Sequence, residues 1–595
     1  MKTSWFSVVV AAVLSGSALA LPAPAPASEP VPTLEPAPAP APAPAPDATV
    51  EVQAIAKTTL AIPAGTVVGS VLAGVENFGG MPFAKPPVAS LRLRPPQRLT
   101  ESFGTIDATG AGPSCPQMFF TTGGNEFIPK VIGNLINTPL FQVVTQQTED
   151  CLTMRVQRPA GTKAGDKLPV FFWIFGGGFE LGSPQMYDAT ALLASAVAQG
   201  KPFIFAAVNY RVAGFGFLPG KEILADGAAN LGHLDQRMGL EWVADNIEAF
   251  GGNPEKVTIW GESAGAISVF NQMALYDGNN TYNGKPLFRG AIMNSGSILP
   301  TDPVDCEKCQ IIYDSVVTTG GCSGAADTLE CLRGLSYDKF LNAVNSVPGL
   351  LSYSSIALSY MPRPDFTALT ASPETLVQEK KYAAVPMIIS DMEDEGTIFA
   401  LFQGNITTTN KLVDYLSELF FTKASPDQVS QLVDTYPASI TAGSPFNTGV
   451  LNAIYPQYKR LAAILGDLAF TLTRRAFLDV AAQVNPDVPS WSFLGSWNFG
   501  TPILGTFHAA DILQIFYGVL PNYASRSTQT YYFNFLYHLD PNGDGTASTG
   551  LPAWPQWKVG KKLMQFYNDR STILADDFRS ASYNFITSNI GSLRV

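Results

Sequence analysis

Short apolar runs alternate with helical segments along most of this chain, and that alternation limits the folds open to it. The runs have the length and composition of buried strands, and they cover residues 168–175 (LPVFFWIF), 203–209, 257–260, 291–294 and 385–389. Residues 235–250 are expected to form the clearest helix, ended by Gly251-Gly252, with one apolar face made by Leu240, Val243, Ile247 and Phe250. This alternation predicts an α/β fold, in which helices cover both faces of a mostly parallel sheet.

The composition is that of a globular protein with a large core, because 46% of the 595 residues are hydrophobic and only 14% are charged. Residues 1–20 are predicted to be a signal peptide, with an apolar run before Ala18-Leu19-Ala20. Residues 21–49 repeat Ala and Pro, which predicts a disordered, extended tail. Residues 50–595 contain no second low-complexity linker, so we expect one large domain there.

The predicted location is extracellular. A membrane anchor at the N-terminus is the alternative, but the apolar run is short and is interrupted by Ser15, Gly16 and Ser17. No later segment is apolar enough to cross a bilayer, so no integral membrane span is expected. The net charge of -12 without a basic cluster argues against binding to nucleic acid or to anionic lipid surfaces. The oligomeric state is left open.

The six cysteines fit disulfides in an exported chain. Local spacing favours Cys306 with Cys309 and Cys322 with Cys331, which leaves Cys115 for Cys151. A redox or zinc pair is the rival interpretation of Cys306-Glu-Lys-Cys309, and no second pair or nearby histidine supports it. Asn279 and Asn405 begin the two motifs that accept N-glycans.

The sequence VTIWGESAGAIS places Ser263 between two glycines, after a strand and before a helix. This order is typical of a nucleophile elbow, whose tight turn lifts the serine hydroxyl above the edge of the sheet. A serine in an ordinary Gly-rich turn is the alternative, because one chance match is not surprising in a chain with 52 glycines. The position between strand and helix favours the nucleophile.

A nucleophilic serine needs a histidine as its base and a carboxylate to orient that histidine. In elbow enzymes the order is serine, acid, histidine, so His233 precedes the serine and is excluded, which leaves His508 and His538. The acid is expected just after the run at 385–389, where spacing alone does not choose among four candidates. They are Asp391, Glu393, Asp394 and Glu395, and three of them are expected to lie in a solvated acidic loop.

The glycines of IFGGGFELG follow the strand at 168–175 and allow backbone N–H groups to approach an oxyanion. Ala264, the residue after the serine, would add another N–H donor. A phosphate loop is the rival interpretation, but no Lys-Ser or Lys-Thr follows, and the glycine spacing of a dinucleotide site is missing. No cofactor and no metal are therefore expected.

Several longer motifs occur in a fixed order along the chain: PFAKPP, SCPQ, TEDCLTMRVQRP, WIFGGGFELGS, IWGESAGAISVF, DMEDEGT, GTFHAADI and LPAWPQW. Through these motifs the chain resembles the type-B carboxylesterase/lipase family of α/β-hydrolases, which includes the cholinesterases. It looks most similar to secreted yeast and fungal lipases, through GCSGAADTLECLRG and SYSSIALSYMPRPD. The resemblance implies an α/β-hydrolase fold with large cap and lid insertions. It also implies hydrolysis of triacylglycerols and, in some members, of sterol esters.

The resemblance further assigns the triad as Ser263, Glu395 and His508, and the oxyanion donors as Gly177, Gly178 and Ala264. It supports the pairs Cys115–Cys151 and Cys322–Cys331, whereas the Cys306–Cys309 pair and the Pro-rich tail have no counterpart in the family. The loop closed by the first pair is expected to be a lid that opens at a lipid–water interface. Its apolar residues are Phe119, Phe120, Phe127, Ile128, Val131, Leu135 and Phe141.

The segment DPNGDGT copies the start of a calcium loop with Asp540, Asn542, Asp544 and Gly545. Its twelfth position is Leu551 and not the bidentate Glu that such loops need, so we expect a turn.

Together these features predict a secreted serine ester hydrolase, most simply a lipase. A carboxylesterase for soluble short-chain or specialised esters is the alternative. A non-catalytic, cholinesterase-like adhesion protein is a remote third, because such proteins lose triad members, whereas this chain keeps all three.

Overall fold

The computed structural model describes residues 56–119, 147–516, 521–545 and 550–595. The predicted signal peptide, the Pro-rich tail and the lid residues from Phe120 to Phe141 lie outside these ranges. The described chain from Lys57 to Val595 forms one compact unit.

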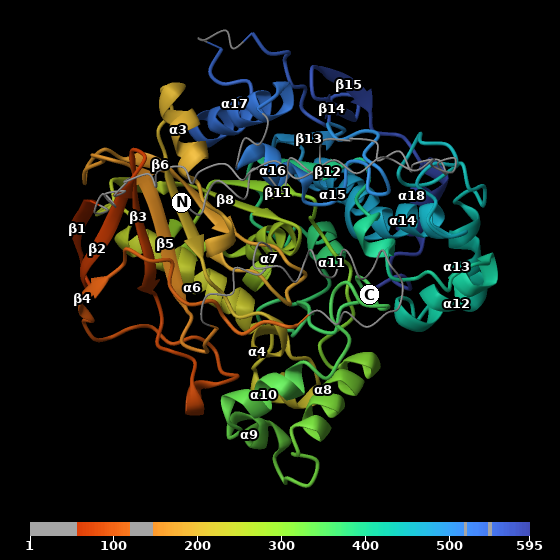
Figure 1. Cartoon of the computed structure of the whole chain (residues 1–595), viewed down its shortest axis with the longest axis horizontal. Helices are drawn as coiled ribbons and strands as arrows, with labels where there is room; N and C mark the ends of the chain where they lie inside the picture. The colour runs from red at the N-terminus through yellow and green to blue at the C-terminus, as the bar shows by residue number, and fades with distance from the viewer. Residues whose placement is uncertain (1–55, 120–146, 517–520, 546–549) are drawn as a thin grey trace, which may run out of the picture. The chain divides into compact units, whose positions relative to one another are not determined.

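A sheet of 13 strands runs through the described part of the chain (Figure 1). Its centre is parallel, in the order β7-β6-β8-β11-β12-β13-β14, and antiparallel strands extend both ends. The strands in spatial order are β1 (Ala56–Ile62), β2 (Gly65–Leu72), β3 (Val75–Pro82), β5 (Thr153–Pro159), β7 (Ile204–Val208), β6 (Leu168–Ile174), β8 (Gly252–Glu262), β11 (Gly290–Asn294), β12 (Met387–Met392), β13 (Ser490–Gly495), β14 (Lys562–Phe566) and β15 (Ser571–Ala575), with β4 (Gly104–Asp107) beside β2.

The central strands are buried along their whole length, since all residues of β7, β11, β12 and β13 are inaccessible to solvent or nearly so. Strands that are covered on both faces read as continuous apolar runs, which is why the sequence reveals them. The five predicted runs correspond to β6, β7, β8, β11 and β12. The predicted α/β architecture with a mostly parallel sheet is confirmed.

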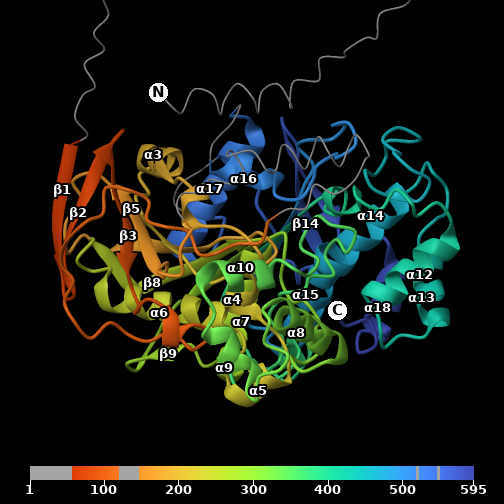
Figure 2. The same ribbon diagram turned by 60° about the horizontal axis from the view of Figure 1, so that its bottom comes forward.

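Helices cover both faces of this sheet, with α3 and α17 on one side and α6 and α7 on the other (Figure 1). In Figure 2, α12, α13 and α18 lie at the end of the sheet away from β1 and β2. The helices are α3 (Thr190–Ala198), α4 (Ala213–Phe217), α5 (Lys221–Asp226), α6 (Leu231–Asn246), α7 (Ala264–Gly278), α8 (Glu307–Thr319), α9 (Thr328–Arg333), α10 (Tyr337–Val344), α11 (Pro373–Gln378), α12 (Thr409–Leu419), α13 (Pro426–Asp434), α14 (Tyr458–Gly466), α15 (Leu472–Val484), α16 (Ala510–Ile515), α17 (Tyr523–His538) and α18 (Ser580–Ser588).

The predicted bounds 235–250 for helix α6 are wrong. Helix α6 begins four residues earlier, at Leu231, and ends at Asn246. Ile247 and Phe250 are buried as expected, but they lie in the turn after the helix. Gly252 already belongs to β8, because the chain must reverse within this turn to enter the sheet.

Candidate active site

Ser263 lies in the sharp turn between β8 and α7, with the left-handed backbone angle φ 57°. The glycines on either side of it allow this turn to pack closely. A Cβ atom on Gly265 would lie 2.1 Å from the carbonyl oxygen of Ile174, and one on Gly261 would lie 2.4 Å from Gly265. The turn is therefore a nucleophile elbow in geometry as well as in sequence.

Ser263, Glu395 and His508 come together although they are far apart in the chain. The Nε2 atom of His508 lies 2.7 Å from the Oγ atom of Ser263. Its Nδ1 atom lies 2.5 Å from Oε2 of Glu395. Because β8, β11, β12 and β13 are consecutive parallel strands of the sheet, the loops that follow their carboxyl ends meet at the same edge.

The acid is buried, and its position is fixed by a second contact. Glu395 is 2% exposed, and its Oε1 atom accepts a hydrogen bond of 2.6 Å from the backbone N–H of Met392. The remaining oxygen is thus left for His508. A carboxylate in this position holds one tautomer of the imidazole and stabilises the imidazolium.

The expected solvated acidic loop is wrong for two of the other three carboxylates. Asp391 is fully buried and pairs with Arg474 at 2.5 Å. Asp394 is also buried and accepts three hydrogen bonds from neighbouring loops. Only Glu393 is partly exposed. The buried partners come from distant parts of the chain, so the sequence pattern did not reveal them.

Two further carboxyl groups near His508 were not singled out from the sequence. The Oε1 atom of Glu262 lies 3.4 Å from Nε2 of His508, and Asp511 in α16 accepts a hydrogen bond of 2.6 Å from the Asn294 amide. Glu262 is the second residue of the G-x-S-x-G motif, and Asp511 follows His508 by three positions. That adjacency is the signal that could have found them.

Burial and the neighbouring carboxyl groups shift the pKa values at this site. Burial disfavours the imidazolium, but the charge and hydrogen bond of Glu395, with Glu262 and Asp511, outweigh it and raise the pKa of His508 to about 9. Burial raises the pKa of Glu262 to about 8 and that of Asp511 to about 6. Protons in this cluster are therefore shared among interacting groups.

Gly177 and Gly178 follow β6 and adopt left-handed backbone angles, φ 111° and 63°. Neither N–H donates to any group in the part of the chain that the structure describes. The N–H of Ala264 begins α7, where the helix offers it no carbonyl partner. A Cβ atom on the neighbouring Gly176 would lie 2.9 Å from the Cβ of Ser263, so this loop packs against the serine.

The other two histidines lie elsewhere. His233 is fully buried in α6, where its ring nitrogens contact Gln236 and Asn271. Burial lowers the pKa of His233 to about 3, so it is a neutral core residue. His538 is exposed at the end of α17 and contacts neither Ser263 nor any of the four acids. Of the two candidates that the sequence left open, His508 is the one beside Ser263.

Three disulfides are present: Cys115–Cys151, Cys306–Cys309 and Cys322–Cys331. The first closes the loop that holds the predicted lid, of which only Phe119 falls in the described ranges. The second caps the start of α8, where Cys306 Sγ accepts from the N–H of Cys309. Asn279 and Asn405 are exposed, as acceptors of glycans must be, and their modification stays a prediction.

Across the described ranges, no cluster of three or more candidate ligands could hold a metal ion. In the calcium-like segment Asp540 bonds to its own neighbour Asn542, whose side chain also pairs with Trp554. Residues 546–549 of this segment lie outside the described ranges. Among the helices described here, none is long and apolar enough to cross a membrane.

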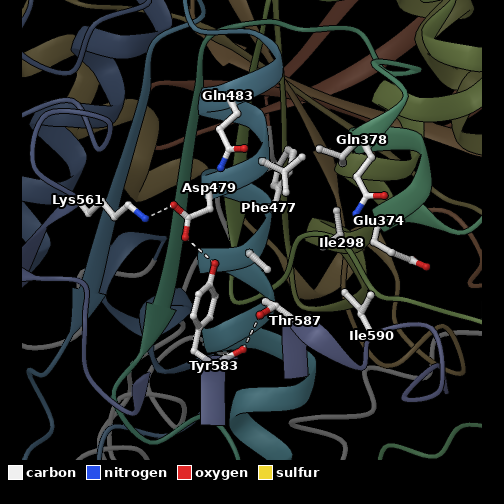
Figure 3. Close-up of a pocket in the computed structure, with 13 residues that line it drawn as sticks. Ile298, Glu374, Gln378, Phe477, Asp479, Gln483, Lys561, Tyr583, Thr587 and Ile590 are labelled. Atoms are coloured by element: carbon white, nitrogen blue, oxygen red, sulfur yellow. Dashed lines mark hydrogen bonds and ion pairs between the residues drawn. The ribbon is translucent and has the colours of Figure 1, made fainter. Parts of the chain in front are cut away.

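A separate pocket of about 230 Å³ opens between α11, α15 and α18 (Figure 3). Its apolar lining includes Ile298, Phe477 and Ile590. Gln378 and Gln483 are exposed beside it, and Asp479 pairs there with Lys561 and Tyr583. No triad residue lines this pocket, so it is not part of the candidate active site.

Comparisons with known proteins show similarity in sequence and in fold. The sequence model of the Carboxylesterase family matches residues 56–586. The secreted triacylglycerol lipase LIP1 of Gibberella zeae is 63% identical over 91% of this chain and 92% of its own. Secreted lipase 1 of Botryotinia fuckeliana is 60% identical over 92% and 96% of the two chains. The crystal structure of Aspergillus niger EstA superposes with a TM-score of 0.76 at 25% identity, covering 91% of this chain and 99% of that one.

Proposed function

Because this chain belongs to the carboxylesterase family, we propose that it is a secreted lipase that hydrolyses triacylglycerols through an acyl-enzyme. The observation that carries the proposal is the hydrogen-bonded series of Ser263, His508 and Glu395. Two relatives at 60% and 63% identity are named as secreted lipases, which supports both the substrate class and the location.

In the first half of the reaction His508 removes the proton from Ser263 Oγ, and this oxygen attacks the ester carbonyl carbon. The carbonyl oxygen becomes an oxyanion that accepts hydrogen bonds from the free N–H groups of Gly177, Gly178 and Ala264. His508 then gives its proton to the departing alcohol. The product of this step is an acyl group bound to Ser263.

In the second half a water molecule takes the place of the alcohol. His508 removes a proton from the water, whose oxygen attacks the acyl carbonyl carbon at the same oxyanion site. The second tetrahedral intermediate collapses, the carboxylic acid leaves, and the proton returns to Ser263. Glu395 stabilises the imidazolium in both halves. These steps need no metal or cofactor.

The surroundings of the triad suit an apolar acyl chain. The rings of Phe470 and Phe399 pack 4.6 Å and 5.0 Å from the imidazole of His508. The Leu350 side chain lies against Gly178, since a Cβ there would be 2.9 Å from Leu350 Cδ2. Apolar walls beside the reacting atoms favour hydrocarbon over charged substrate groups.

We further propose that residues 50–595 form one catalytic domain, with the predicted signal peptide at 1–20 and the tail at 21–49. The single compact unit from Lys57 to Val595 supports the first part. The lid, the two N-glycans and action at a lipid–water interface belong to the same proposal.

The test measures acid release by the secreted protein from esters of increasing acyl length and from triacylglycerols below and above their solubility limit. A lipase hydrolyses long-chain esters, and its rate rises when an emulsion forms. Turnover confined to soluble short-chain esters would make the protein a carboxylesterase instead. Absence of turnover on every ester would exclude both enzymes and favour the adhesion protein.

A further inference from the structure

We propose that Asp394 is a positioning residue that holds the histidine-bearing loop at the correct distance from Ser263. The proposal rests on the triad assigned above. It concerns the acid's immediate neighbour in the chain, which does not touch the imidazole itself.

The loop that carries His508 has little structure of its own. Between the end of β13 at Gly495 and the start of α16 at Ala510, no residue belongs to a helix or to a strand. The Nδ1 contact with Glu395 orients the ring but does not fix the main chain. Something else must therefore set the place of His508.

Asp394 binds this loop two residues before the histidine. Its Oδ2 atom accepts a hydrogen bond of 3.0 Å from the N–H of Thr506, and its own N–H donates to the carbonyl of Thr506 at 2.9 Å. The backbones of Asp394 and Phe507 also form an isolated parallel β-bridge. Both backbone groups of Thr506 are thus bound by one residue, which is adjacent to Glu395.

The other oxygen of Asp394 anchors the carboxylate to a different loop. Oδ1 accepts from Ser444 Oγ at 2.8 Å and from the N–H of Phe446 at 2.9 Å. Asp394 is only 1% exposed, so water cannot replace these partners. The carboxylate therefore links a fixed support on one side to the histidine loop on the other.

Gly505 shows how closely the histidine loop is pressed against this carboxylate. It has a left-handed φ of 59°, and a Cβ atom there would lie 2.1 Å from Oδ2 of Asp394. Any side chain at position 505 must push the loop and the carboxylate apart. A misplacement of about 1 Å near reacting atoms can cost up to roughly 100-fold in rate.

The test compares two variants that remove hydrogen bonds of the same carboxylate. Asp394→Ala removes the side-chain bond to Thr506 in the histidine loop together with both bonds of Oδ1, and leaves the backbone bond to Thr506. It should lower kcat about 10- to 100-fold with KM changed less than about twofold. Ser444→Ala removes one bond on the support side only and should keep kcat within about twofold. The concentration of active enzyme is measured by labelling Ser263 to completion with an organophosphonate, and kcat is calculated from that concentration. Loss of folded enzyme therefore does not lower the measured kcat.

Two further variants keep the test decisive. Asp394→Asn retains one acceptor oxygen and should recover part of the kcat lost in Asp394→Ala. If Asp394→Ala does not fold, Gly505→Ala answers the same question, because it keeps the carboxyl group of Asp394 but pushes it and the loop that holds Thr506 apart. It should lower kcat like Asp394→Ala.

Equal kcat in Asp394→Ala and Ser444→Ala, or an unchanged kcat in Gly505→Ala, would overturn the positioning role. Either result leaves the proposed function intact as long as wild-type turnover depends on Ser263. Failure of the wild-type protein to hydrolyse any ester would instead contradict the proposed function.

Discussion

The Nε2 atom of His508 lies 2.7 Å from the Oγ atom of Ser263, although 245 positions separate the two residues in the chain. The sheet makes this contact possible, because β8 and β13 are parallel and end at the same edge. The distance is within the range for a hydrogen bond that passes a proton to a general base.

Removing either partner should nearly abolish turnover. We expect Ser263→Ala and His508→Ala to lower kcat by at least about 10⁴-fold, because neither the nucleophile nor its base can then act. His538→Ala is the matched control, since this histidine is exposed and distant from the site, and it should keep wild-type kcat. Near-normal hydrolysis by Ser263→Ala, measured in a titration of released acid, would rule out this triad.

Glu395 and Glu393 offer a comparison of two nearby carboxylates. We expect Glu395→Gln to lower kcat by about 10²- to 10⁴-fold, because the amide no longer stabilises the imidazolium. Glu393→Gln should have little effect, since Glu393 is partly exposed and, within the described ranges, the carboxylate that contacts His508 Nδ1 is that of Glu395. Steady-state rates on one soluble ester measure both. Equal losses in the two variants would show that Glu395 is not the acid.

The acid Glu262 should set the pH dependence of the base. The imidazole must be neutral to accept the proton of Ser263, so kcat/KM is expected to rise with pH through the pKa of His508, near 9. Glu262 lies 3.4 Å from Nε2 and helps to raise that pKa. Glu262→Gln should therefore move the acid limb of the pH profile down by roughly one unit. An unchanged or higher apparent pKa would contradict this electrostatic role.

Buried carboxyl groups should make the folded protein more stable in mild acid. Burial raises the pKa of Glu180 to about 8, whereas an unfolded glutamate ionises near 4.5. Between these values the folded state holds a proton that the unfolded state has lost, so stability falls as pH rises, by up to about 1.4 kcal/mol per pH unit and group. Burial also raises the pKa of Glu262, so this group changes stability in the same direction.

We expect the midpoint of thermal unfolding to decrease from pH 5 to pH 8. Glu180→Gln removes one titrating group without touching the triad, and it should flatten this decrease. A midpoint that rises with pH over this range would show that these carboxyl groups are ionised in the folded protein.

The sequence predicts those elements whose burial leaves a local pattern. The strands β6, β7, β8, β11 and β12 appear as apolar runs because both of their faces are covered. The strands at 56–107 were not predicted, since several of their residues are exposed or half-buried and the apolar runs are broken. The bounds of α6 were also missed, because packing of Ile247 and Phe250 in the core does not require them to be helical.

At the site, sequence alone located Ser263 but left two histidines and four acids open. The resemblance to known esterases was needed to choose His508 and Glu395, and the structure then brings these residues together. The roles of Asp391 and Asp394 could not be read from the sequence, because their partners Arg474 and Thr506 are 83 and 112 positions away. Long-range partners of this kind depend on the folded arrangement of loops.

The central claim is that Ser263 is the nucleophile that His508 activates. The most direct measurement treats the protein with an alkylphosphonate ester and locates the covalent adduct by peptide mass spectrometry. We predict one adduct per chain, on the peptide that contains Ser263, with loss of ester hydrolysis in proportion to labelling and much slower labelling in His508→Ala. An adduct on another residue, or full hydrolysis after Ser263 is labelled, would contradict the account.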